Sequence, residues 1–185
     1  MEHRLKPVAP PAGRRQTMVE KRKDGNGGSL LALRLAYYGE VAVALVDYVT
    51  RALDRHWFFA AGVSQFILAV VGLALVVGGL VLRIAAGRAL GKWWSLRAEI
   101  REGQPLVRTG VYRVTRHPAY LGMLIVCLGI PIAFQSMWAG VVMALGVWPA
   151  LAHRINVEER LLENHFGEEY RDYAKHTPRL IPWVV

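Results

Sequence analysis

An uninterrupted apolar run over residues 57–82 constrains the fold of this chain more than any other feature. The run reads WFFAAGVSQFILAVVGLALVVGGLVL and contains no charged residue. A helix needs about 20 such residues to cross the hydrocarbon core of a bilayer, where every backbone polar group must be paired within the segment. We therefore predict a membrane-spanning helix over residues 57–82.

A second apolar block extends over residues 119–152 and carries no charged residue before His153. It is too long for a single span. A proline and two polar residues lie near its middle, and they favour a break: Pro131, Gln135 and Ser136. The block predicts two short helices joined by a tight turn, over 119–134 and 137–152, and a helix kinked at Pro131 is the alternative.

Residues 29–50 form a weaker apolar segment, interrupted by Arg34, Glu40 and Asp47. Charged side chains within a membrane usually face the protein interior or a water-filled cavity. We interpret the segment as a span packed against its neighbours, and a helix lying in the membrane interface is the alternative. Together, the four segments predict an all-α integral membrane fold with about four transmembrane helices.

The distribution of charge narrows the class of protein further. The formal net charge is +9 and the mean hydropathy is +0.25. The basic residues lie between apolar blocks, which excludes a nucleic-acid binder and makes the lipid bilayer the expected partner. The single cysteine, Cys127, lies inside an apolar block, so we predict neither an internal disulfide nor a metal site.

The loop over 83–118 is strongly basic and predicts the orientation of the chain. It carries eight Lys and Arg residues against Glu99 and Glu102. The positive-inside rule places such a loop in the cytoplasm, together with residues 153–185. The first 28 residues are also basic and are rich in Pro and Gly, so we expect a disordered tail over 1–28 and a single membrane domain over 29–185.

Residues 153–175 predict an amphipathic helix that is bent near Gly167. Arg154 and Glu158 are four positions apart and therefore share one face of this helix. The other polar and aromatic side chains of this helix are interpreted as structural rather than catalytic. We expect a solvated face from Glu163, Glu168 and Glu169, and packing or capping roles for His165 and Tyr170.

The order of motifs in the second half of the chain resembles one enzyme family. QPLVRTGVYRVTRHPAYLG is followed by two short apolar helices, then by HRINVEERLLENHFGEEYRDY and RLIP. This pattern is similar to the isoprenylcysteine carboxyl methyltransferase family from about Leu90 to Pro182. The resemblance implies an integral membrane enzyme that uses S-adenosylmethionine and lacks the Rossmann sheet of soluble methyltransferases. The chain accordingly shows no G-x-G-x-x-G after a strand.

The resemblance also implies which residues form the site. Arg154 would be the catalytic residue that faces the substrate. The cytoplasmic segment and the C-terminal helix would enclose the cofactor, with contacts from Gln104, Pro105, Leu106, Val107, Tyr112, His117, Pro118, Ala119, Tyr120 and Glu158. Relatives often have His where this chain has Gln104, and GPY where it has Gly110-Val111-Tyr112, which weakens the first contact and the turn.

Physical chemistry is consistent with these residue types. A carboxylate acceptor is already ionised at neutral pH, because its reference pKa is about 4, so methyl transfer to it needs no general base. Positioning and desolvation then dominate, and an Arg such as Arg154 can hold a carboxylate with two hydrogen bonds. An amine acceptor would instead have to lose a proton, for which Glu158 or Glu159 would be the base.

Several functions are compatible with the pattern. The first is carboxyl methylation of a prenylated cysteine or a similar lipidic acid. The alternative is N- or S-methylation of a phospholipid headgroup or a small molecule. Sterol-type reductases share the C-terminal architecture but are usually much longer than 185 residues. A non-catalytic membrane protein would also retain the helices, since Arg116-His117-Pro118 alone is compatible with a membrane-entry signal.

Overall fold

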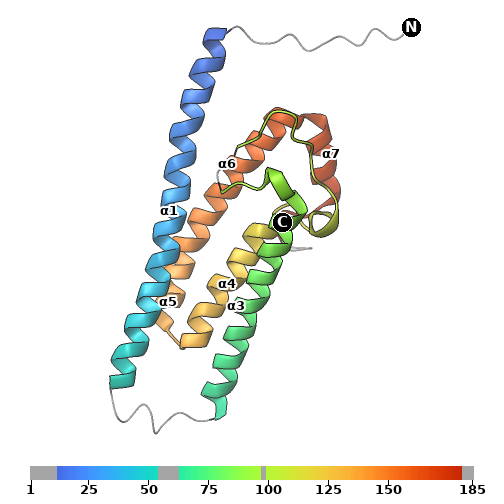
Figure 1. Ribbon diagram of the computed structural model, residues 1–185. Coiled ribbons are helices and arrows are strands. Elements are labelled where there is room, and N and C mark those ends of the chain that lie inside the picture. Colours follow the sequence, from blue (N-terminus) through green and yellow to red (C-terminus); the bar gives the residue numbers. More distant parts are fainter. Residues whose placement is uncertain (1–11, 54–62, 97–98, 181–185) are drawn as a thin grey trace, which may run out of the picture.

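The computed structural model describes residues 12–53, 63–96 and 99–180, which form helices and connecting segments without a strand. The long elements are α1 (Ala12–Leu53), α3 (Val63–Leu90), α4 (Pro118–Phe134) and α6 (Trp148–Phe166). Figure 1 shows these helices running side by side, with the short α7 (Glu168–His176) at one end. The predicted all-α fold is confirmed.

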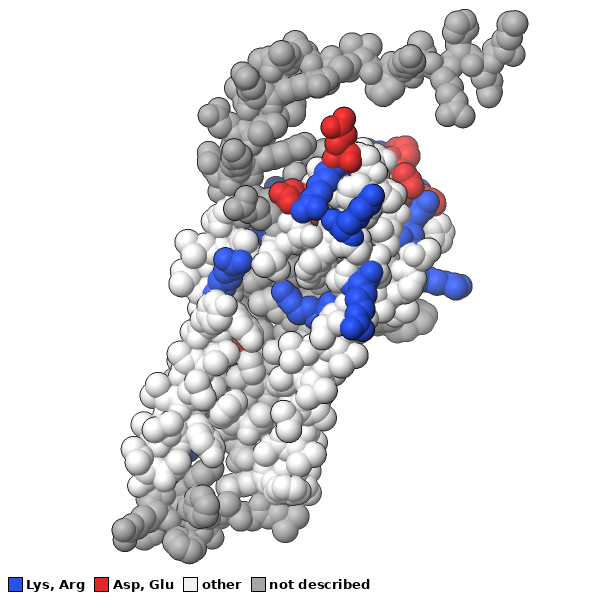
Figure 2. All heavy atoms as spheres, in the orientation of Figure 1, with Lys and Arg blue, Asp and Glu red and all other residues white. Residues whose placement is uncertain are grey.

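Within the part of the chain that the structure describes, three helices are long and apolar enough to cross a membrane. They cover Gly27–Leu53, Ser64–Trp93 and Met137–Phe166, and α4 is a shorter apolar helix beside them. All four predicted segments are therefore helical over their described residues, while 54–62 lies outside them. Figure 2 shows charged side chains gathered mostly at the end that carries α7, whereas the shaft below is nearly free of charge on this face.

The predicted turn near residue 135 is confirmed, and its cause is local. Gln135 ends α4 in the left-handed conformation, with φ of 52°. Ser136 then caps α5 (Met137–Val142) by accepting a hydrogen bond from the amide of Ala139 at 3.1 Å. Pro131 lies inside α4 rather than at the turn.

Two predicted boundaries differ from the structure. The span 137–152 and the helix after it were expected to be separate elements. Instead, α5 continues through a π-helical stretch, Met143–Val147, directly into α6. No residue between Trp148 and Phe166 breaks the helix, because Pro149 lies in the first turn of α6, where proline is tolerated. The helix α1 begins at Ala12, within the expected disordered tail, where Arg, Gln, Glu and Lys favour helix.

Helices α3 and α4 are held together at glycines. A Cβ added to Gly79 would lie 2.5 Å from the Gly122 carbonyl oxygen, and one added to Gly129 would lie 2.7 Å from the Gly72 carbonyl oxygen. Small residues permit this close approach of two backbones in a membrane. The pair carries the segment that connects the two helices, which is described over 91–96 and 99–117.

Helix α1 packs on the other side of the bundle, against α4, α5 and α6. Its lower end is fixed by Arg51, which donates to the carbonyl oxygens of Gln135 and Phe134 at 2.8 and 2.9 Å. Its middle buries Glu40 completely, as expected for a charged residue within a packed span. The side chains of α1 are described from Gly27 onward, and this end of the helix reaches the site described below.

Candidate active site

Arg154 is the most deeply buried charged side chain near the charged end of the bundle, with 1% of its surface exposed. Its guanidinium joins three elements. It donates to the Tyr120 hydroxyl of α4 at 3.2 Å, to the Ser29 hydroxyl of α1 at 2.9 Å and to the Leu96 carbonyl at 3.0 Å. The family resemblance predicts that Arg154 faces the substrate. The structure shows that Arg154 holds α1, α4 and the connecting segment together.

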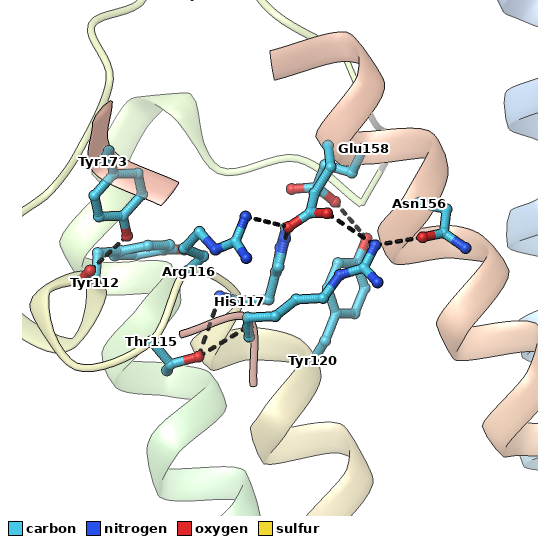
Figure 3. Close-up of polar contacts among 10 residues, drawn as sticks. Tyr112, Thr115, Arg116, His117, Tyr120, Asn156, Glu158 and Tyr173 are labelled. Carbon is cyan, nitrogen blue, oxygen red and sulfur yellow. Dashed lines mark hydrogen bonds and ion pairs between the residues drawn. The ribbon is translucent and has the colours of Figure 1, made fainter. Parts of the chain in front are cut away.

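Tyr120 links Arg154 to Glu158. The Tyr120 hydroxyl donates to the carboxylate of Glu158 at 2.6 Å while it accepts from Arg154. The shared face of Arg154 and Glu158 was predicted from their spacing, but the tyrosine between them was not. Figure 3 shows Tyr120 pointing from α4 toward Glu158 on α6.

Glu159 is the centre of a second set of contacts. Its carboxylate pairs with Arg116 at 2.8 Å, with His117 Nε2 at 3.2 Å and with Arg179 at 2.8 Å. Arg179 also donates to Asn156. The Arg116 amide donates to the Pro178 carbonyl at 2.9 Å, so the C-terminal segment is fixed against the loop that precedes α4.

Tyr112 lies on the short 3₁₀ helix Gly110–Arg113 and is buried. Tyr173 of α7 donates to its carbonyl oxygen at 2.5 Å, as Figure 3 shows. Burial raises the pKa of Tyr173 to about 12. Burial and the neighbouring charge of Glu158 also raise the pKa of Tyr112 above its usual value. Both phenols are therefore neutral hydrogen-bond donors at physiological pH.

Replacing Tyr173 with Phe should lower the free energy of unfolding by about 1–2 kcal/mol, because the Tyr112 carbonyl would be buried without its partner. A thermal melt in detergent measures this change. Tyr38→Phe is the matched control, because Tyr38 is 64% exposed on α1. The melting temperature of this variant should equal that of the unmodified protein. Equal melting temperatures for Tyr173→Phe and the unmodified protein would contradict the assigned hydrogen bond.

Two adjoining cavities lie among these groups. The first cavity is bounded by the connecting segment, α6 and α7. Its lining includes predicted cofactor contacts and an apolar wall, namely Gln104, Pro105, Leu106, Val107, Tyr112, Glu158, Leu161, Leu162 and Phe166. The second cavity is bounded by α1, α3, α4 and α6. Its lining includes Arg83, His117, Ala119, Tyr120, Met123 and Arg154.

The two cavities share Leu90, Ser95, Tyr112, Arg116 and Glu158. The predicted site residues are thus brought together, but in two groups. Gln104 to Val107 line the first cavity, whereas His117, Ala119, Tyr120 and Arg154 line the second. Pro118 starts α4 and lines neither cavity. Its fixed backbone angle suits the first turn of a helix, which places His117 and Tyr120.

Sequence reasoning missed several residues of this region. Arg83, Arg116, Ser29 and Tyr170 were not assigned to the site, and Glu159 was named only as a base for an amine acceptor. Arg116 was recognisable from its place beside His117. Ser29 and Arg83 carried no local signal, because tertiary packing alone brings α1 and α3 to Arg154 and Tyr120.

A third cavity continues from the second toward the membrane shaft. It shares Leu30, Leu33, Arg83, Leu96 and Met123 with the second cavity. Its remaining lining comes from α1, α3 and α4 and is mostly apolar or aromatic, consisting of Arg34, Tyr37, Tyr38, Leu80 and Val126. The three cavities therefore form a series that begins at polar groups and ends between apolar helices.

Comparison with known proteins supports the resemblance found in the sequence. Residues 67–169 match the phospholipid methyltransferase family. Protein-S-isoprenylcysteine O-methyltransferase B of Arabidopsis thaliana is 31% identical over 165 residues, which cover 84% of this chain and 78% of that protein. The Mus musculus protein-S-isoprenylcysteine O-methyltransferase is 37% identical over 119 residues, which cover 63% of this chain and 42% of the mouse protein.

A solved structure shows the same fold. It is described as the eukaryotic intramembrane Ras methyltransferase ICMT (isoprenylcysteine carboxyl methyltransferase), and it superposes with a TM-score of 0.66 at 28% identity. The match covers 77% of this chain and 52% of that structure, so the chain spans about half of its length. The likeness to an intramembrane protein agrees with the apolar helices, and the chain is a multi-pass integral membrane protein.

Proposed function

Since this chain belongs to the isoprenylcysteine carboxyl methyltransferase family, whose members use S-adenosylmethionine, we propose that it methylates the carboxylate of a lipidic acceptor, most directly a prenylated cysteine. The observation that carries the proposal is the series of three cavities. It joins a polar pocket with cofactor-type contacts to a second pocket lined by the buried Arg154 and the half-buried Arg83, and then to a mostly apolar space between helices.

The first cavity fits S-adenosylmethionine by the chemistry of its lining. Leu161, Leu162 and Phe166 provide an apolar wall for an adenine ring. Tyr112 supplies a neutral donor and Glu158 an acceptor for ribose or amino groups, and Gln104 to Val107 would add largely backbone contacts. When bound, the cofactor supplies an electrophilic methyl group on a sulfonium.

The second cavity suits a carboxylate. Arg154 and Arg83 both line it, and cations stabilise an anion taken out of water. Arg83 makes a weak contact with the Ala119 carbonyl, at 3.5 Å, which leaves most of its donors for an acceptor. The guanidinium of Arg154 is held by Tyr120, Ser29 and Leu96, so its charge is fixed in position before an acceptor binds.

The third cavity suits a lipid chain. Leu30, Leu33, Leu80 and Met123 line it, and Arg83 lines both this cavity and the second. An acceptor with a carboxylate at one end and an isoprenoid at the other would place its charge near Arg83 and Arg154. Its apolar tail would then lie among α1, α3 and α4, where burial of apolar surface is favourable.

In this arrangement the chain promotes methyl transfer by positioning the acceptor carboxylate against the cofactor. The acceptor carboxylate needs no base at neutral pH. The chain's contribution is to exclude water with the Leu and Phe side chains of both cavities, and to aim the carboxylate with two cations. Glu158 lies on the boundary of the two cavities and is held by Tyr120, so it would orient the cofactor rather than the anionic acceptor.

We further propose that the site faces the cytoplasm. The basic segment 83–118 lies at the charged end of the bundle together with α7, and the positive-inside rule favours a cytoplasmic location for that end. On this basis residues 29–185 act as one membrane domain. The lipid bilayer is then both the solvent of the apolar helices and the source of the acceptor.

The purified protein in lipid should transfer labelled methyl from S-adenosylmethionine to N-acetyl-S-farnesylcysteine. The product should release labelled methanol in base, because a carboxyl methyl ester is hydrolysed whereas N- and S-methyl groups are retained. The matched control is N-acetyl-S-farnesylcysteine carboxamide, which keeps the lipid but lacks the carboxylate and should accept no label. Base-stable label on a lipid amine or a thiol would contradict carboxyl methylation and support the alternative acceptors.

A further inference from the structure

Arg116 and Tyr170 are polar residues of the first cavity to which the proposed function assigns no role. Both line that cavity. Tyr170 is 4% exposed, and its hydroxyl lies near Arg116 and Glu159 but makes no well-aligned hydrogen bond to any described residue. The Nε atom of Arg116 is likewise buried and without a partner there. Buried polar groups are almost always paired, so two unpaired donors on one cavity wall point to a ligand.

The charged side chains that line the first cavity indicate which chemical group of the ligand lies beside Arg116 and Tyr170. Among the described residues that line it, Arg116 is the only Lys or Arg, whereas Glu99 and Glu158 are carboxylates. The methionine part of S-adenosylmethionine carries one carboxylate and one ammonium, beside the sulfonium. A carboxylate enclosed with Glu99 and Glu158 would be repelled, and Arg116 is the cation available to hold it.

Arg116 is fixed in place from the opposite side. Its Nη1 pairs with Glu159 at 2.8 Å, and its backbone amide donates to the Pro178 carbonyl at 2.9 Å. Glu159 is itself held by His117 and Arg179. Figure 3 shows Arg116 between Tyr112 and Glu158. A guanidinium held at one nitrogen and unpaired at another is preorganised to receive an anion.

We propose that Arg116 and Tyr170 bind the carboxylate of the cofactor's methionine moiety and thereby set the position of the sulfonium at the boundary with the second cavity. The inference rests on the proposed function in taking S-adenosylmethionine as the cofactor. It assigns Arg116 to the cofactor although that residue also lines the second cavity, because Tyr170 lines only the first. Arg83 and Arg154 remain for the acceptor.

The test is a binding measurement that does not depend on turnover. Isothermal titration of the purified protein in lipid nanodiscs would compare S-adenosylhomocysteine with its decarboxylated analogue, which lacks only the carboxylate. The unmodified protein should bind S-adenosylhomocysteine more tightly. Tyr170→Phe should weaken that affinity about tenfold and Arg116→Gln about a hundredfold, and both should bind the decarboxylated analogue within about twofold of the unmodified protein.

Each outcome is decisive. An equal loss for both ligands, or no loss for either variant, would overturn the assignment of the carboxylate to Arg116 and Tyr170. A change in acceptor KM without a change in S-adenosylhomocysteine affinity would assign Arg116 to the acceptor instead. Tyr170→Phe removes one oxygen and decides the question where Arg116→Gln fails to fold. The matched control is Tyr48→Phe, at a residue that lines none of the three cavities. An unmodified protein that binds neither ligand would overturn the proposed function as well.

Discussion

Replacing Arg154 with Ala is expected to reduce methyl transfer at least about a hundredfold, measured as kcat/KM for the prenylcysteine acceptor. The side chain is buried and donates to Tyr120, Ser29 and Leu96, which belong to three different elements. Its removal deletes a fixed cation beside the second cavity and takes away a donor from each of these three groups, and a buried acceptor that loses its partner costs about 1–3 kcal/mol. A displacement of reacting groups by about 1 Å is enough for a loss of this size.

The matched control is Arg160→Ala on the same helix. Arg160 is exposed, lines neither cavity and should retain full activity. Arg154→Lys separates charge from geometry, because an ammonium keeps the charge but cannot present the planar fork that reaches three partners. We expect Arg154→Lys to remain at least tenfold below the unmodified protein. Activity of Arg154→Ala above a tenth of the unmodified level would contradict the assigned role.

Replacing Gly79 with Ala is expected to lower the free energy of unfolding by about 1–3 kcal/mol, the usual cost of overpacking. The added Cβ would lie 2.5 Å from the Gly122 carbonyl oxygen and 2.9 Å from the Val126 amide nitrogen. Both atoms are backbone, so α3 and α4 must separate to accommodate it. Thermal unfolding in detergent, followed by circular dichroism, measures the change.

The neighbouring glycine provides the control. A Cβ added to Gly78 would meet nothing within 4 Å, so Gly78→Ala adds a methyl group that faces away from the seam. Alanine favours helix over glycine by up to about 1 kcal/mol, and we expect Gly78→Ala to be neutral or stabilising. Two adjacent Gly→Ala changes should therefore shift stability in opposite directions. Equal shifts would show that the close α3–α4 approach does not limit stability.

The helices were predictable because their signals are local. A charge-free run of 26 residues must be a span, and the caps at Gln135 and Ser136 end one helix and begin the next. The bend at Gly167 was also predicted, and its φ of 57° explains why glycine lies there. The exposed positions of Glu163, Glu168 and Glu169 confirm the expected solvated face.

Predictions from the sequence were wrong or incomplete where the local sequence signal was weak or absent. The boundary between α5 and α6 was expected near residue 152, because hydropathy falls there, but a fall in hydropathy does not end a helix that has no breaking residue. Tyr170 was predicted to be a packing or capping residue. Its ring is buried as expected, yet its hydroxyl lines a cavity without a well-aligned hydrogen bond to any described residue, which no sequence pattern records.

The sequence by itself determined the class of the molecule, the apolar helices and the motifs that place this chain in its family, because hydropathy and residue order are properties of the chain alone. Only the tertiary structure decided how the polar residues meet. Arg154 contacts Tyr120 across 34 positions and Ser29 across 125. Such contacts depend on how the helices pack, and that packing is set by close-approach glycines and buried side chains distributed over the whole domain.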